Sequence, residues 1–375
     1  MEHDFELLEE LTEARGVPGY EDRIREIVRR EFDETVDRVR TDAMGNVVGT
    51  IEGIGDGNES ADGSESDDGS ESDDGSESDD GSYSVAVAAH MDEIGFMVKH
   101  VTDEGFLQVD ALGGFDPRVL RAQRVTVHSD DGDLTGVIGS VPPHTLTEEQ
   151  REKKDEVEDV YIDVGLDGDA ASEQVAVGDL VTLDQTTVEM GELVTGKALD
   201  DRVCVFQLLE AARRIEDPDV TIHFAATVQE EVGLRGAQAL GVDVDPDLAI
   251  ALDVTVANDV PQIGDESKQV TEVGEGTAVK LKDSSVITNP KVNRRLRDVA
   301  ERREIDHQLE VLPAGGTDTA GFQNTHGAKP VGAISIPTRY LHTVTESAHV
   351  DDIDAAIDLL VAFLETETGE NDYTL

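Results

Sequence analysis

The sequence predicts an α/β protein with a mixed, mostly parallel sheet covered by helices and a small β-rich domain inserted into it. From residue 188 onward, apolar strand-like runs alternate with segments of helical spacing, which is typical of a parallel sheet covered on both faces. Between residues 96 and 186, short alternating runs are separated by Gly or Asp turns. We therefore expect one α/β domain of residues 1–95 and 187–375 and an inserted β domain of residues 96–186.

The chain begins with two predicted helices. Apolar residues recur at helical spacing over residues 4–15 and 20–33, and the Gly and Pro residues of Gly16–Gly19 indicate a turn between them. Short apolar runs then predict strands at residues 46–51 and 84–89.

The remaining elements follow the same two patterns. The β-rich region has alternating runs at Arg124–His128, Leu134–Ile138, Val160–Val164 and Leu180–Leu183. The last part of the chain predicts helices at 203–215, 233–240, 290–303, 318–325 and 351–366, and strands at Val220–Val228, Leu248–Leu252, 307–311 and Val331–Ile336.

Composition excludes several classes of partner. The 375 residues contain 84 Asp and Glu against 30 Lys and Arg, a net charge of −54, which repels nucleic acids and anionic membrane surfaces. The sequence contains no run of about 18 apolar residues, the length that could span a bilayer. The acidic start MEHDFELLEE does not match a signal peptide. The single cysteine, Cys204, excludes an intramolecular disulfide and favours a reducing cytoplasm.

Part of this charge lies in a repeat. Residues 54–82 contain 12 acids, no base and three copies of GSESDD, and removing those charges leaves −42 on the other residues. We interpret the repeat as a disordered, solvated insertion between two strands rather than a calcium site, because it lacks a twelve-residue loop with a closing Glu. The remaining excess predicts a halophilic protein, with an ordinary acidic mesophilic protein as the alternative.

Ionisable residues follow the ends of several predicted strands, where open α/β sheets bind ligands. Four segments lie after strand runs and one lies before helix 203–215: His90–Met91–Asp92, Gln229–Glu230–Glu231, Asp253, His342 and Asp200–Asp201. Any one of these could be structural. Five such segments, whose ionisable residues are all His, Asp or Glu, predict one shared site.

This residue set suits two divalent cations. Zinc binds imidazole nitrogen and carboxylate oxygen, and two metals about 3.5–4 Å apart need a bridging carboxylate. In the pair Glu230–Glu231, one residue can bind metal while its neighbour takes a proton from the attacking water. Asp92 is spaced to orient the imidazole of His90.

Seven segments carry a family resemblance. In chain order they are AAHMDEIGFMV, GKALDDRV, VQEEVGLRGA, ALDV, DSSVITNP, GGTDTAG and SIPTRYLHT. With GGFDPR at 113–118 and GVIGSVPPH at 136–144, they resemble the M42 family of di-metal aminopeptidases, which are glutamyl aminopeptidase-like and include the tetrahedral (TET) enzymes. The resemblance covers nearly all of the chain except residues 54–82.

The resemblance implies a di-zinc exopeptidase-like fold with a PDZ-like β domain that dimerises, and a hollow homo-dodecamer that admits peptides. It also implies two ions, zinc or cobalt, and a role for each matching residue. Asp200 would bridge the metals, His90 and Asp253 would complete one site, Glu231 and His342 the other, Glu230 would be the general base, and Asp201 would hold Asp200 across a cis peptide.

Some residues have two interpretations. The family usually continues His-Ser-Pro-Val-Glu at His342, whereas this chain reads His342–Thr343–Val344–Thr345–Glu346, so the loop that would border the substrate differs. His349 is a rival ligand for His342, and Cys204 is either a thiolate ligand or a small packing residue. Thr317 and Asp318 either contact substrate or cap helix 318–325.

We predict a metalloaminopeptidase. The alternatives are another di-metal hydrolase such as a carboxypeptidase or deacylase, a glycosidase, which needs two carboxylates and no metal, or a non-enzymatic acidic scaffold. Chelation separates metal hydrolases from glycosidases, and N-blocked peptides separate aminopeptidases from the other peptidases and deacylases. Deletion of residues 54–82 tests a scaffold role for the repeat, and we expect hydrolysis to survive it.

Overall fold

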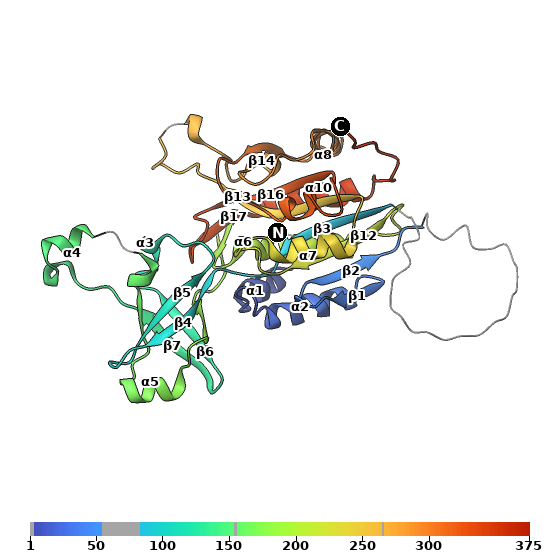
Figure 1. Cartoon of the computed structure of the whole chain (residues 1–375). Helices are drawn as coiled ribbons and strands as arrows, with labels where there is room; N and C mark the ends of the chain where they lie inside the picture. Colours follow the sequence, from blue (N-terminus) through green and yellow to red (C-terminus); the bar gives the residue numbers. More distant parts are fainter. Residues whose placement is uncertain (1–3, 55–82, 154–155, 265) are drawn as a thin grey trace, which may run out of the picture.

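The computed structural model describes residues 4–54, 83–153, 156–264 and 266–375. The acidic repeat therefore lies outside the described residues. The chain forms a large mixed sheet with helices on both faces and a separate closed β-barrel to one side of it (Figure 1). In the described part of the chain, no helix is both long and apolar enough to cross a bilayer.

The helices of the α/β part are α1 (Phe5–Glu13), α2 (Asp22–Asp33), α6 (Leu199–Arg214), α7 (Arg235–Val244), α8 (Pro290–Arg303), α9 (Thr319–Gln323) and α10 (Val350–Leu364). Its strands are β1 (Arg38–Thr41), β2 (Val47–Ile51), β3 (Ser84–His90), β10 (Val188–Met190), β11 (Leu193–Gly196), β12 (Thr221–Thr227), β13 (Leu248–Val256), β14 (Thr277–Lys282), β15 (His307–Val311), β16 (Val331–Arg339) and β17 (Glu346–His349).

Four central strands of the sheet are parallel. The main order is β1-β2-β12-β3-β13-β16-β17-β11-β10, and β14 pairs with both β15 and β16. Neighbours run parallel through β12, β3, β13 and β16, while strands farther out, such as β2 and β17, pair antiparallel. The register places Thr227 beside His90 and Asp253 beside Ser335. The carboxyl ends of the central strands therefore share one edge.

Helices cover both faces of the sheet. The larger apolar core lies between the sheet and α1, α2, α6, α8 and α10, whereas α7 and α9 pack on the opposite face through Leu240 and Phe322. Helix α2 approaches β2 closely at Phe32, since a Cβ on Gly49 would lie 3.0 Å from its ring. Both faces of the central strands are thus removed from water, which explains their continuous apolar sequences.

The barrel consists of β4 (Gly95–Val101), β5 (Phe106–Leu112), β6 (Arg124–Ser129), β7 (Gly132–Ile138), β8 (Tyr161–Asp163) and β9 (Leu180–Leu183), closed in the order β4-β5-β8-β7-β6-β9. Short helices α3 (Pro117–Leu120), α4 (Glu148–Glu152) and α5 (Gly168–Gln174) lie outside it. Its interior is a separate apolar cluster that includes Phe96, Leu107 and Val127.

A buried arginine joins the first helix, α1, to the carboxyl edge of the central sheet. Arg202, in the first turn of the regular part of α6, is fully buried. It donates hydrogen bonds to the carbonyl oxygens of Leu11 (2.5 Å), Ala14 (2.8 Å) and Met91 (2.6 Å). Because Met91 directly follows β3, Arg202 holds the turn after this strand against α1.

Candidate active site

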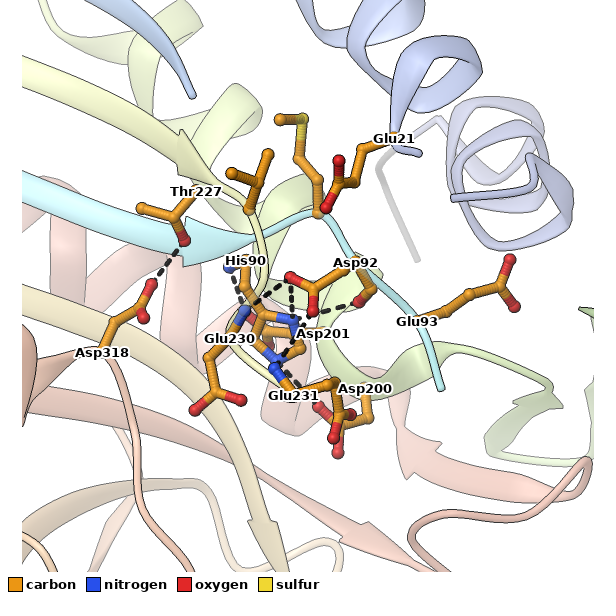
Figure 2. A network of polar contacts seen from close by, with 12 residues as sticks. Glu21, His90, Asp92, Glu93, Asp200, Asp201, Thr227, Glu230, Glu231 and Asp318 are labelled. Carbon is orange, nitrogen blue, oxygen red and sulfur yellow. Dashed lines mark hydrogen bonds and ion pairs between the residues drawn. The ribbon is translucent and has the colours of Figure 1, made fainter. Parts of the chain in front are cut away.

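The predicted site residues gather at the carboxyl edge of the parallel strands. Figure 2 shows most of them, including His90, Asp200 and Glu230. His90 is the last residue of β3, the pair Glu230–Glu231 follows β12, and Asp253 lies within β13, which runs four residues farther than expected. Asp200 comes from the irregular start of α6 and His342 from the segment between β16 and β17. Segments far apart in the sequence thus contribute to one cluster.

Asp200 lies between two imidazoles. Its Oδ1 is 3.2 Å from Nε2 of His90, and its Oδ2 is 3.4 Å from Nε2 of His342. Oε1 of Glu231 is 3.7 Å from the same nitrogen of His342. The bond between Asp200 and Asp201 is a cis peptide, as the resemblance implies. A carboxylate whose two oxygens face two different histidines has the arrangement of a bridging ligand.

His90 belongs to two groups of potential ligands. Its ligand atom lies within 4.8 Å of those of Asp200 and Glu231, and the same holds for His90 with Asp201 and Asp253. Asp201 also accepts a hydrogen bond from the backbone N–H of His90 (3.0 Å). Asp201 therefore supports β3 and at the same time offers a carboxylate beside Asp253.

Asp92 holds the two glutamates through their backbone. Its Oδ1 accepts from the N–H of Glu230 and its Oδ2 from the N–H of Glu231, both at 3.0 Å (Figure 2). Nδ1 of His90 lies 3.1 Å from the main-chain oxygen of Asp92 and 3.6 Å from its carboxylate. Asp92 therefore orients His90 mainly through its carbonyl, while its carboxylate positions Glu230 and Glu231.

Glu346 is a site residue that we did not single out from the sequence. Its buried carboxylate accepts from the backbone N–H of Asp200 (3.0 Å) and from that of His342 (2.8 Å). Burial raises the pKa of Glu346 to about 8, and the charge of Asp200 adds to this shift. Its position, four residues after His342, was the available signal, because it keeps the Glu of the family segment.

The barrel reaches into the site through the loop after β5. The carbonyl oxygen of Gly114 lies 2.7 Å from Nδ1 of His342. The next residue, Phe115, stacks on Phe96 of the barrel core with ring centroids 4.4 Å apart. In the segment that departs from the family, Thr343 lines the recess beside Asp200, whereas Val344 packs into the barrel core.

Thr317 and Asp318 directly precede α9. Asp318 makes no side-chain cap to this helix and instead accepts a hydrogen bond from the hydroxyl of Thr227. Its second oxygen, Oδ1, is buried and has no hydrogen-bond partner among the described residues. The hydroxyl of Thr317 pairs with that of Thr319 at 2.7 Å. The geometry therefore gives no capping role to the Asp318 side chain.

The two rival ligands have other environments. His349 caps α10 by accepting from the N–H of Asp351 (3.1 Å), and its Nε2 is 3.8 Å from Glu192. Cys204 is fully buried in the large core beside Asp201, and burial raises the pKa of its thiol well above its ordinary value. A thiolate at Cys204 is therefore disfavoured, which supports its interpretation as a packing residue.

Burial and charge shift the acids of the cluster. Burial raises the pKa of Glu230 well above its ordinary value, and it raises the pKa of Glu231 to about 7. Burial acts on Asp200 in the same direction, but hydrogen bonds to His342 and His90 outweigh it and hold the pKa of Asp200 below its usual range. In turn, Asp200 raises the pKa of His342 to about 10 against the effect of burial.

The cluster has more buried carboxylates than cations to neutralise them. The imidazoles are those of His90 and His342, and the carboxylates are Asp92, Asp200, Asp201, Glu230, Glu231, Asp253, Asp318 and Glu346. Nearby buried lysines already have partners, because Lys197 pairs with Glu93 (2.6 Å) and Lys280 with Glu310 (2.5 Å). Crowded buried carboxylates must take up protons or bind cations. Together with imidazole nitrogens they fit divalent metal ions.

Known proteins that are similar to this chain in sequence and fold are aminopeptidases and peptidases. A candidate aminopeptidase of Acetivibrio thermocellus is 37% identical over 358 residues, covering 95% of this chain and 97% of that protein. The structure of an aminopeptidase from the archaeon Desulfurococcus kamchatkensis aligns with a TM-score of 0.86 and 36% identity over 97% of this chain and 95% of the other. Pyrococcus horikoshii TET1 peptidase, which can assemble into a tetrahedron or a large octahedral shell, aligns with a TM-score of 0.80 and 31% identity, covering 97% and 99%.

The family model of the M42 glutamyl aminopeptidases matches residues 75–359, which include every site residue described above. The same residues contain both the central sheet strands that carry the cluster and the whole barrel. The chain therefore belongs to the M42 aminopeptidase family.

Proposed function

We propose that this protein is a two-metal aminopeptidase that removes the N-terminal residue of peptides, with Glu230 as its general base. The observation that carries the proposal is the position of Asp200, whose two carboxylate oxygens face Nε2 of His90 and Nε2 of His342. A carboxylate shared in this way is what a pair of divalent ions requires.

The ligand assignment is the one that the family resemblance implies, and the contacts of Asp200 support it. His90 and Asp253 would complete the coordination of one ion and Glu231 and His342 that of the other, with zinc or cobalt as the metal. Asp201 would support the first ion through its contact with the backbone of His90. When bound, the ions would polarise the scissile carbonyl and make a nucleophilic water available near neutral pH.

The protein's own groups would then orient the substrate and move the proton. Glu230 lies in the cluster but belongs to neither group of potential ligands found among the described residues, which supports a role in taking a proton from the attacking water rather than in binding metal. It would return this proton to the leaving amine. The carboxylate-rich wall, including the unpartnered oxygen of Asp318, would attract the free N-terminal amine of the peptide and so limit cleavage to the first residue.

We extend the proposal to assembly and location. Pyrococcus horikoshii TET1 peptidase can assemble into a tetrahedron or a large octahedral shell. With the family resemblance, this supports the proposal that the β domain of residues 96–186 mediates a dimer and that dimers build a homo-dodecamer. Such a chamber would admit peptides but no folded proteins. The charge of −54 supports neither nucleic-acid nor membrane partners, and the single cysteine favours the cytoplasm.

Chelation and N-terminal blocking test the proposed reaction. We expect EDTA to abolish hydrolysis of amino-acyl p-nitroanilides, and zinc or cobalt to restore it, because the cluster supplies ligands but no other electrophile. The same peptides with an acetylated N-terminus should not be cleaved. Hydrolysis that survives metal removal, or cleavage of blocked peptides at an equal rate, would contradict the proposal.

Salt tests the proposed halophilic character. With net charge −54, we expect the thermal midpoint to fall when the protein moves from molar salt to about 50 mM NaCl, where the Debye length exceeds about 10 Å and surface carboxylates repel one another. Circular dichroism melts at matched pH and metal concentration measure this. An unchanged midpoint across the series would reject salt adaptation without touching the proposed reaction.

A further inference from the structure

Asn46 lies outside the metal cluster but contacts the chain segment that carries Glu230. It directly precedes β2, and its side chain is fully buried. Its Oδ1 accepts from the N–H of Val228 (3.0 Å), and its Nδ2 donates to the carbonyl oxygen of Gly236 (3.2 Å). These two residues are the ends of the segment 228–236, which we name the Glu230 loop.

Asp42 sets the orientation of the Asn46 amide. One carboxylate oxygen of Asp42 accepts from the N–H groups of Met44 (2.8 Å), Gly45 (2.9 Å) and Asn46 (3.0 Å). The other accepts from Nδ2 of Asn46 at 2.6 Å. Because a carboxylate only accepts, Nδ2 must face Asp42, which leaves Oδ1 toward Val228.

The Glu230 loop has a backbone that needs such support. Gln229, Gly233 and Leu234 have φ of 56°, 116° and 58°, a region that side-chain-bearing residues adopt only at a cost. The N–H of Gly236 closes the loop by donating to the carbonyl of Val228 (3.0 Å). A Cβ on Gly236 would lie 2.5 Å from Oδ1 of Asn46, so the close approach of the two residues requires glycine here.

We propose that Asn46 is a positioning residue for catalysis, because it clamps both ends of the Glu230 loop while Asp92 holds its middle. This inference rests on the proposed function, in which Glu230 takes the proton from water. Asn46 touches neither substrate nor reacting atoms. It acts through the backbone of Val228 and Gly236, and it would keep the carboxylate of Glu230 within reach of the water.

Three variants test the clamp. Asn46→Leu is near in size and releases both ends of the loop. Asn46→Asp keeps the oxygen that accepts from Val228 but replaces the Nδ2 donor with an oxygen that faces the carboxylate of Asp42 and the carbonyl of Gly236. In the double variant with Asp42→Asn, the new amide at position 42 can donate to this oxygen. The matched control is Asn293→Leu, because Asn293 is another buried asparagine, bonded to the hydroxyl of Thr288 (2.8 Å) at the start of α8.

We expect Asn46→Leu to lower kcat about ten- to a hundredfold with KM changed less than about threefold, since misplacing a catalytic group by about 1 Å has such an effect. Metal content at saturating zinc should equal that of the wild type. Asn293→Leu should keep kcat even where its melting temperature falls as far. Asn46→Asp should also lose kcat, and the double variant should recover part of it.

Hydrogen exchange of the holoenzyme tests the clamp without using activity. Peptides covering residues 228–236 should exchange faster in Asn46→Leu than in the wild type, and no faster in Asn293→Leu. The clamp is wrong if this exchange is unchanged, if kcat of folded Asn46→Leu at saturating zinc stays near the wild-type value, or if both asparagine variants lose kcat equally. A wild-type protein that releases no N-terminal residues would instead overturn the proposed function, and the exchange result would still decide the clamp.

Discussion

Glu230→Gln is expected to remove turnover while leaving the bound metal unchanged. Gln keeps the size of Glu and the backbone N–H that donates to Asp92, but it cannot accept a proton. General-base catalysis contributes typically about 10²–10⁴-fold, so kcat should fall by that factor. Steady-state kinetics on an amino-acyl p-nitroanilide, with metal content measured by mass spectrometry on the same sample, check both parts of the expectation.

Two further glutamates serve as controls for this variant. Glu231→Gln should lose metal as well as activity, because Glu231 faces His342 and Asp200. Glu216→Gln changes an exposed residue in the segment between α6 and β12 and should alter neither metal content nor activity. A Glu230→Gln enzyme with near-normal kcat would show that another group takes the proton.

Asp200→Asn is expected to prevent stable binding of both metal ions. The change keeps the shape of the side chain but removes the charge that faces His90 and His342. Because the ions supply several kcal/mol of transition-state stabilisation, activity should fall by about 10³-fold or more. Zinc should raise the melting temperature of the wild type, since a ligand of the folded state stabilises it, and this rise should shrink or disappear in the variant.

Asp247→Asn is the matched control for Asp200. Asp247 accepts from the N–H of Ser84 at the opposite end of β3, far along the strand from His90. We expect this variant to keep its metal and its activity. If Asp200→Asn still binds two metals per chain with unchanged affinity, Asp200 does not bridge them and the ligand assignment needs revision.

The sequence predicted the central sheet and the strand-end cluster because both depend on short-range patterns. Buried parallel strands such as β3 and β13 are continuous apolar runs, and polar residues directly after them fall at one edge. The exposed edge strand β1 and the short strand β10 have no such pattern, and we did not predict them. Their pairing comes from neighbours that tertiary packing provides.

Residues that act through backbone groups were harder to predict. Glu346 holds the N–H groups of Asp200 and His342, and Asn46 holds the ends of the Glu230 loop. Residue type predicts neither role, because the partner is a main-chain atom brought near by the fold, and the only signal was the place of Glu346 in the family segment. Asp92 combines both cases: its carboxylate lies 3.6 Å from Nδ1 of His90, where we expected it, and it also accepts from the N–H groups of Glu230 and Glu231, which we did not predict.

The contact between Gly114 and His342 links the inserted barrel to a proposed metal ligand. With a metal bound and the imidazole neutral, the carbonyl of Gly114 would hold the ring proton on Nδ1 and leave Nε2, on the side of Asp200, for the metal. Val344 anchors the same segment inside the barrel. A different domain grafted in place of the barrel would have to provide a carbonyl at the position of Gly114. We therefore expect the barrel and His342 to evolve together.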